Sequence, residues 1–149
     1  MAGVQTCALP IYINEIHFYV NPEASYAALM EDWTAPHEMS HLAIPFLGKK
    51  YKWFAEGFAT YLSRRIMIDM GYFTESTFDS MYVYRIGEAG SSYSNPVKPF
   101  SVVSQELFDD YNYSAVYWGS AGFFYTADQQ LQEKHDMTLA ELLKEYLEY

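Results

Sequence analysis

The chain has 149 residues, of which 50% are hydrophobic, 19% are aromatic and 19% are charged. This composition is typical of one folded domain and excludes a disordered or collagen-like chain, and the longest apolar runs are too short to cross a bilayer. Nine Lys and Arg against 19 Asp and Glu give a net charge of -10, which argues against nucleic acid or an anionic membrane surface as a partner.

Residues 3–11 (GVQTCALPI) resemble the translation of a sequencing-library adapter joined in frame to a gene. We therefore treat residues 1–11 as an artefactual tail outside the fold, and expect residues 12–149 to be part of one domain whose N-terminal portion is missing. The lone Cys7 then carries no information on redox compartment. Localisation stays open, an extracytoplasmic or cell-envelope site included, as do membrane association and oligomeric state.

The first predicted element is a short edge strand over residues 12–20, where Ile, Tyr, Phe and Val are frequent. A helix follows over residues 34–43, with Thr34 as its N-cap and Pro45 beyond its end. A second helix is expected from about residue 51 to 70, because apolar residues recur there at helical spacing and Gly71 follows.

A third helix is predicted over residues 75–86, followed by a long loop over residues 87–99 that is rich in Gly, Ser, Asn and Pro. Further helices are expected over residues 101–109 and 114–134. The last helix begins at Thr138, which forms a capping box with Glu141. The predicted fold class is mainly α (α+β), helical with a short N-terminal edge strand.

Chemistry is concentrated in His37-Glu38-Met39-Ser40-His41, an HExxH sequence within a predicted helix. Residues four apart point the same way from a helix, so His37 and His41 can bind one metal ion. Glu38 lies about 100° further round the helix, where it can reach a metal-bound water without binding the metal.

A third ligand is available in WFAEGFATYL, residues 53–62, where Glu56 stands near the start of the next predicted helix. Two imidazoles and one carboxylate leave a fourth position for water, which is the arrangement of a catalytic zinc site rather than a structural one. The same set could bind iron or cobalt, and we predict zinc.

HEMSH followed by WFAEGFATYL resembles the gluzincin metallopeptidases, most closely the aminopeptidase N and glycyl aminopeptidase type of catalytic domain. The resemblance covers roughly residues 30–135. It implies a gluzincin-like helical fold over residues 12–149, His37, His41 and Glu56 as zinc ligands, and Glu38 as the general base.

In that family a tyrosine on a later helix, in a Tyr-x-x-Gly-like context, helps to stabilise the tetrahedral intermediate. The segment VYWGSA, residues 116–121, is similar to that element and makes Tyr117 its best match. The glycine falls one place early, and Tyr111 and Tyr113 stand nearby as alternatives. Second carboxylates that orient the imidazoles are expected, with Asp109, Asp110 and Glu88 as candidates.

The chain also departs from the family. The spacer between His41 and Glu56 is about four residues shorter than is usual, and the Gly-x-Met-Glu-Asn segment of the aminopeptidases has only a superficial echo in residues 30–32, MED. Endopeptidase and aminopeptidase activity therefore both stay open.

The predicted function is zinc-dependent hydrolysis of a peptide or protein substrate, with Glu38 as base. The alternatives are a non-catalytic zinc- and peptide-binding module and a fragment too incomplete to be active.

Overall fold

The computed structural model describes residues 5–6, 16–30 and 32–148, and within these ranges the chain is mainly helical, as predicted. None of the helices in these ranges is long and apolar enough to cross a bilayer. The α-helices are α1 (Tyr26–Met30), α2 (Thr34–Ser40), α3 (Lys52–Asp69), α4 (Glu75–Gly90), α5 (Phe100–Asp109), α6 (Tyr113–His135) and α7 (Leu139–Leu147), and the short 3-10 helices are η1 (His41–Ala43), η2 (Lys49–Tyr51) and η3 (Ser91–Tyr93).

Two short strands precede the helices. Strand β1 (Gln5–Thr6) pairs antiparallel with β2 (Phe18–Tyr19), so that Gln5 lies opposite Tyr19. The strand predicted over residues 12–20 is thus only two residues long where it is described, and residues 12–15 lie outside the described ranges. The tail that we exclude from the predicted fold contributes β1 to this pair.

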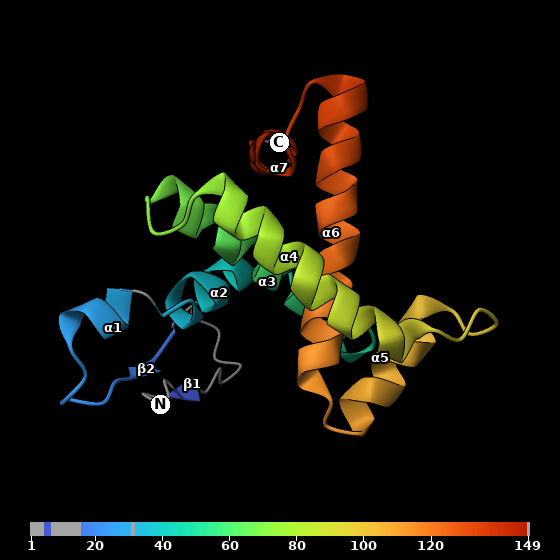
Figure 1. The fold of residues 1–149 in the computed structure, drawn as a ribbon, viewed down its shortest axis with the longest axis horizontal. Coiled ribbons are helices and arrows are strands. Elements are labelled where there is room, and N and C mark those ends of the chain that lie inside the picture. The colour runs from blue at the N-terminus through green and yellow to red at the C-terminus, as the bar shows by residue number, and fades with distance from the viewer. Residues whose placement is uncertain (1–4, 7–15, 31, 149) are drawn as a thin grey trace.

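Helix α6 is the long rod around which the other helices are arranged (Figure 1). Helices α3 and α4 both pack across it, and α2 packs on α3. Helix α5 lies near the N-terminal end of α6, and α7 folds back beside its C-terminal end (Figure 1). The first turn of α6 is therefore near α5, and its middle is covered by α3 and α4.

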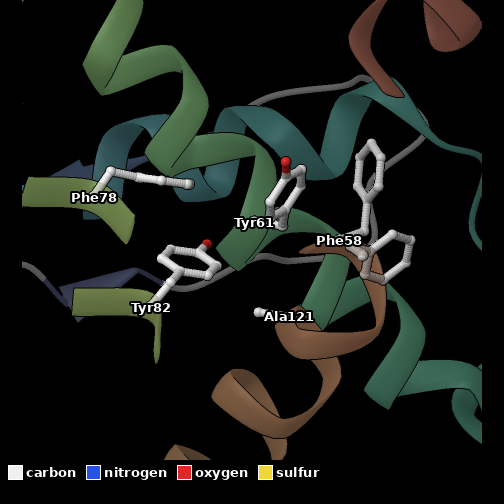
Figure 2. Packing of buried hydrophobic residues seen from close by; sticks show 6 residues of the cluster. Phe58, Tyr61, Phe78, Tyr82 and Ala121 are labelled. Carbon is white, nitrogen blue, oxygen red and sulfur yellow. The ribbon is translucent and has the colours of Figure 1, made fainter. Parts of the chain in front are cut away.

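The hydrophobic core lies where α3, α4 and α6 meet (Figure 2). Its aromatic rings pack closely, and the rings of Phe78 and Tyr82 are stacked with centroids 4.3 Å apart. Aromatic pairs of this kind add about 0.5–1.5 kcal/mol beyond the burial of their area. The buried cluster consists of Phe58, Tyr61, Phe78, Tyr82, Ala121 and Phe124.

The start of α2 differs from the prediction. Thr34 is the first helical residue rather than the N-cap, and Trp33 occupies the cap position without a side-chain hydrogen bond. The Thr34 backbone N–H donates instead to Oδ1 of Asp32 at 2.8 Å. The carboxylate two residues upstream therefore satisfies one of the free N–H groups at the helix start.

Helix α4 is longer than predicted, because it continues through Gly87 and ends at Gly90 instead of stopping near residue 86. Glycine inside a helix costs only about 1 kcal/mol relative to alanine, and packing against α6 outweighs that cost. The predicted loop over residues 87–99 is correspondingly short. Helix α1 was not predicted, and it begins after Ser25, whose Oγ accepts a hydrogen bond from the Ala28 N–H at 3.2 Å.

Two other helix boundaries confirm their sequence signals. Gly71 follows α3 with a positive φ of 79°, the left-handed conformation that glycine adopts without strain. At the start of α7, Oγ1 of Thr138 accepts from the Glu141 N–H at 3.2 Å, while Oε2 of Glu141 accepts from the Thr138 N–H at 2.7 Å. This is the predicted capping box.

A buried carboxylate, Asp128 of α6, joins three helices. It is 3% exposed and accepts hydrogen bonds from the Tyr61 hydroxyl of α3, from the Leu139 backbone N–H of α7 at 2.5 Å, and from Gln132 at 3.0 Å. Burial first, and then the hydrogen bond to Asp128, raises the pKa of Tyr61, so its hydroxyl keeps the proton that it donates. Asp128 thereby fixes α7, which has no buried residue of its own.

Replacing Asp128 with alanine should lower the free energy of unfolding by about 2–4 kcal/mol, because the Tyr61 hydroxyl and the Leu139 N–H lose their partner. Urea unfolding measures this change, and faster amide exchange in α7 should accompany it. Asp69→Asn, at the exposed end of α3, is the control and should stay within about 0.5 kcal/mol. Equal unfolding midpoints for wild type and Asp128→Ala would contradict the role of this carboxylate.

Candidate metal centre

The two histidines of the HExxH sequence come from one continuous helical run. His37 lies in α2 and is 3% exposed, whereas His41 is the first residue of η1, where the helix tightens before Pro45. Ile44 is already extended, as expected for a residue before proline. The two imidazole rings are 5.0 Å apart at their centroids and nearly perpendicular, so both face one point.

Glu56 reaches that point from the first turns of α3. Its Oε2 lies 3.2 Å from Nε2 of His37 and 3.5 Å from Nε2 of His41. Tetrahedral ligands at 2.0–2.2 Å from a zinc ion are about 3.3–3.6 Å apart, so these distances fit such a site. One ligand atom from each of the three residues falls within 4.8 Å of the others.

The charges of this cluster also suit a cation. Burial alone would raise the pKa of Glu56, but hydrogen bonds to His37 and His41 outweigh it and lower that pKa to about 2. Burial lowers the pKa of His41, and the hydrogen bond and charge of Glu56 more than offset it, so that pKa is raised. Without metal the anionic carboxylate is paired with imidazole protons, and metal binding must release protons.

Glu38 lies beside the cluster and outside the ligand set. It is partly buried, and its negative charge contributes to the raised pKa values of both His41 and Tyr117. A carboxylate in this place is near the ligands without joining the three atoms that converge. This is the position that the helical spacing predicts for a base.

Of the three candidate tyrosines, the structure brings Tyr117 to the cluster. Its ring centroid is 5.7 Å from that of His37. Burial, and then the charges of Glu56 and Glu38, raises the pKa of its hydroxyl. Tyr113 lies one ring further out, stacked on Tyr117 at 6.5 Å, and Tyr111 lies beyond Tyr113.

The expected carboxylate behind the imidazole is not found. Nδ1 of His37 is buried and has no hydrogen-bond partner among the described residues. Asp109 accepts from Gln105 instead, Glu88 accepts from Tyr84, and both acids are exposed, as Asp110 is. The three candidates lie around the ends of α4 and α5. Their distance from His37 depends on how the helices pack, so it could not be predicted from the sequence.

Arg64 lies two turns after Glu56 on α3 and supports the cluster through aromatic side chains. This role was not predicted from the sequence. Its guanidinium carbon lies 5.3 Å from the centre of the Trp33 ring and 5.6 Å from that of Trp118. Trp33 in turn meets His37 edge to face, with centroids 4.8 Å apart. Arg64 is only 8% exposed, and cation–π contacts worth about 1–2 kcal/mol each join α2, α3 and α6 around it.

The distance between α3 and α6 is set by Gly57, the residue after Glu56. A Cβ atom built on Gly57 would lie 2.3 Å from the Ser120 Cβ and 2.6 Å from the Ser120 carbonyl carbon. Only glycine permits this approach. It brings Glu56 on one helix opposite Tyr117 on the other.

Comparisons with protein families, curated protein sequences and solved structures find no match for this chain. The resemblance to gluzincins therefore stays a prediction that rests on the HEMSH and WFAEGFATYL segments.

Gly57→Ala should weaken the metal centre, because the two helices must separate to admit the methyl group. Alanine has the higher helix propensity by about 1 kcal/mol, yet a contact of 2.3 Å outweighs that gain, and we expect a net loss of about 1–3 kcal/mol in unfolding free energy. Urea unfolding and zinc titration measure the two effects.

Gly87→Ala is the matched control, since Gly87 lies inside α4 with no atom near its Cβ position. That variant should gain up to about 1 kcal/mol and keep its affinity for zinc. If both substitutions stabilise the protein equally, Gly57 does not set the distance between the helices.

Proposed function

We propose that this chain is the catalytic part of a zinc metallopeptidase that hydrolyses peptide bonds. The observation that carries the proposal is the convergence of His37, His41 and Glu56, in which Oε2 of Glu56 lies 3.2 Å and 3.5 Å from the Nε2 atoms of the two histidines. Zinc suits two imidazoles and one carboxylate, and three protein ligands leave one position open for water.

The bound zinc would act as a Lewis acid on the scissile carbonyl and activate a water molecule. Residues of the chain do the rest. A carboxylate oxygen of Glu38 accepts the proton of the attacking water and passes it to the nitrogen of the leaving amine. The C–O bond forms and the C–N bond breaks, so that the hydroxyl of the water remains on carbon and its other proton ends on the leaving nitrogen.

The Tyr117 hydroxyl donates a hydrogen bond to the carbonyl oxygen as negative charge develops there. Two features support this role. Its ring centroid lies 5.7 Å from that of His37, and its hydroxyl is near enough to Glu56 and Glu38 for their charges to raise its pKa. The cluster is partly buried but accessible to solvent, with the side chains of His41 and Glu56 27% and 22% exposed.

The net charge of -10 favours a peptide or protein substrate over nucleic acid. A non-catalytic zinc- and peptide-binding module would keep the three ligands but would need no base. Glu38 therefore distinguishes the two functions, and its replacement is the central experiment.

Purified wild-type protein should hold about one zinc ion per chain by elemental analysis, and His41→Ala should lose it. His135→Ala, on the exposed end of α6, is the control and should retain zinc. Glu38→Gln should keep the zinc but lose at least 100-fold in peptidase activity, because the base is gone. Glu133→Gln, exposed on α6, should match wild type.

A folded wild-type chain without zinc would rule out the proposal. Zinc without cleavage of any peptide would favour the binding module, and full activity of Glu38→Gln would rule out Glu38 as the base.

Tyr117→Phe should lower kcat by about 10²–10³-fold with little change in zinc content, since one donor to the developing oxyanion is removed. Steady-state kinetics on a peptide substrate measure this loss. Tyr111→Phe and Tyr113→Phe test the two alternatives and should lower kcat less than Tyr117→Phe does. Tyr146→Phe, exposed on α7, is the control and should match wild type. A larger loss in Tyr111→Phe or Tyr113→Phe than in Tyr117→Phe would move the oxyanion role to that residue.

A further inference from the structure

A row of aromatic rings leads away from the metal centre across the start of α6. The ring of Tyr113 stacks on Tyr117 at 6.5 Å and 29°, and the rings of Phe108 and Tyr111 meet Tyr113 edge to face at 5.3 Å and 6.0 Å. The row ends in solvent, with Tyr113 41% and Tyr111 78% exposed. Its exposed rings therefore begin one ring away from the proposed oxyanion donor.

Tyr111 has a backbone conformation that is unfavourable for its residue type. Its φ is +60°, in the left-handed region that is costly for a bulky residue. The turn that contains Tyr111, at the end of α5, is of the same kind as the turn at the end of α3, where Gly71 occupies the equivalent position. The N–H of residue 111 donates to Phe108 and the next N–H to Leu107, as those of residues 71 and 72 donate to Ile68 and Met67.

Where this turn ends α3, the chain uses glycine, which adopts the conformation without strain. Tyr111 is mostly exposed, so burial of its ring does not compensate for the strain. Strained residues retained without a packing reason are concentrated at binding and catalytic sites. The Tyr111 side chain is therefore best explained by what it binds.

We infer that the exposed faces of Tyr111 and Tyr113 form a subsite that binds an aromatic side chain of the peptide substrate. This inference rests on the proposed peptidase function. Aromatic rings prefer offset-stacked or edge-to-face contacts with other rings, as Tyr113 already makes with Tyr117, Phe108 and Tyr111. An extended peptide advances about 3.3–3.6 Å per residue, so the subsite falls within a few residues of the scissile bond.

The probes are labelled peptides of alanine, serine and glycine in which a single Phe is moved position by position, together with the peptide that lacks Phe. We expect wild type to bind the best-placed Phe peptide about three- to tenfold more tightly than the peptide without Phe. The zinc-loaded and the chelator-treated chain should share this preference, because stacking needs no metal. The kcat/KM values should follow it where cleavage occurs.

Tyr111→Gly is the decisive variant. It should unfold at a temperature roughly 2–4 °C higher, because the strain is relieved, and should lose most of its preference for the Phe peptide. Asp136→Gly is the matched control, since Asp136 ends α6 with a φ of +51°. It should gain similar thermal stability and keep the preference for the Phe peptide. Tyr146→Gly is a second control and should keep that preference.

The outcomes separate the two proposals. A Phe preference that survives in Tyr111→Gly, or that wild type never shows, overturns the subsite even if the protein is an active peptidase. A Phe preference that depends on Tyr111 in a chain that cleaves nothing supports the subsite and overturns the peptidase function.

Discussion

The approach of α3 to α6 at Gly57 and Ser120 is the constraint on which the candidate centre depends. Backbone lies against backbone there, so the separation of the two helices cannot vary with side-chain rotamers. Glu56 precedes Gly57, and Tyr117 lies nearly one turn before Ser120, so the anionic ligand and the aromatic hydroxyl face each other as a consequence. Helix α2 then takes its position from α3, and the imidazoles take theirs from α2.

Within this packing, the cost of burying the Glu56 carboxylate is offset by the imidazoles of His37 and His41. A buried carboxylate is costly, and Glu56 is compensated by two imidazoles rather than by arginine or lysine. Imidazoles release protons near neutral pH, whereas a guanidinium does not, so this compensation can be exchanged for a metal ion. The one arginine nearby, Arg64, makes its contacts with the rings of Trp33 and Trp118 instead. It supports the histidine helix without competing for the carboxylate.

Local signals were sufficient for most of the helices and for bringing together the candidate ligands His37, His41 and Glu56. The period of four in residues 37–41 places two imidazoles together in any helix, and the capping box at Thr138 depends on four residues alone. Other features depended on tertiary packing. Helix α4 continues through Gly87 because it packs on α6, and the short distance between the rings of Tyr117 and His37 also results from the packing of helices. Contacts between helices leave no period in a sequence, so the extension of α4 could not be predicted, and Tyr117 was selected only by the resemblance of its segment to a family motif.

Residues that match the local backbone preference can be distinguished from residues that are retained against it. Gly71 and Tyr111 end two helices with the same hydrogen bonds, and only the first has the residue that the backbone prefers. Gly57 shows the opposite case, because a residue that weakens a helix is kept where a larger one would separate α3 from α6. Gly57 and Tyr111 both lie along the line from Glu56 through Tyr117 to Tyr111. Asp136, at the far end of α6, also has a positive φ, but aspartate tolerates this conformation better than tyrosine. The close-packed glycine and the strained tyrosine thus lie beside the proposed site of chemistry and substrate binding.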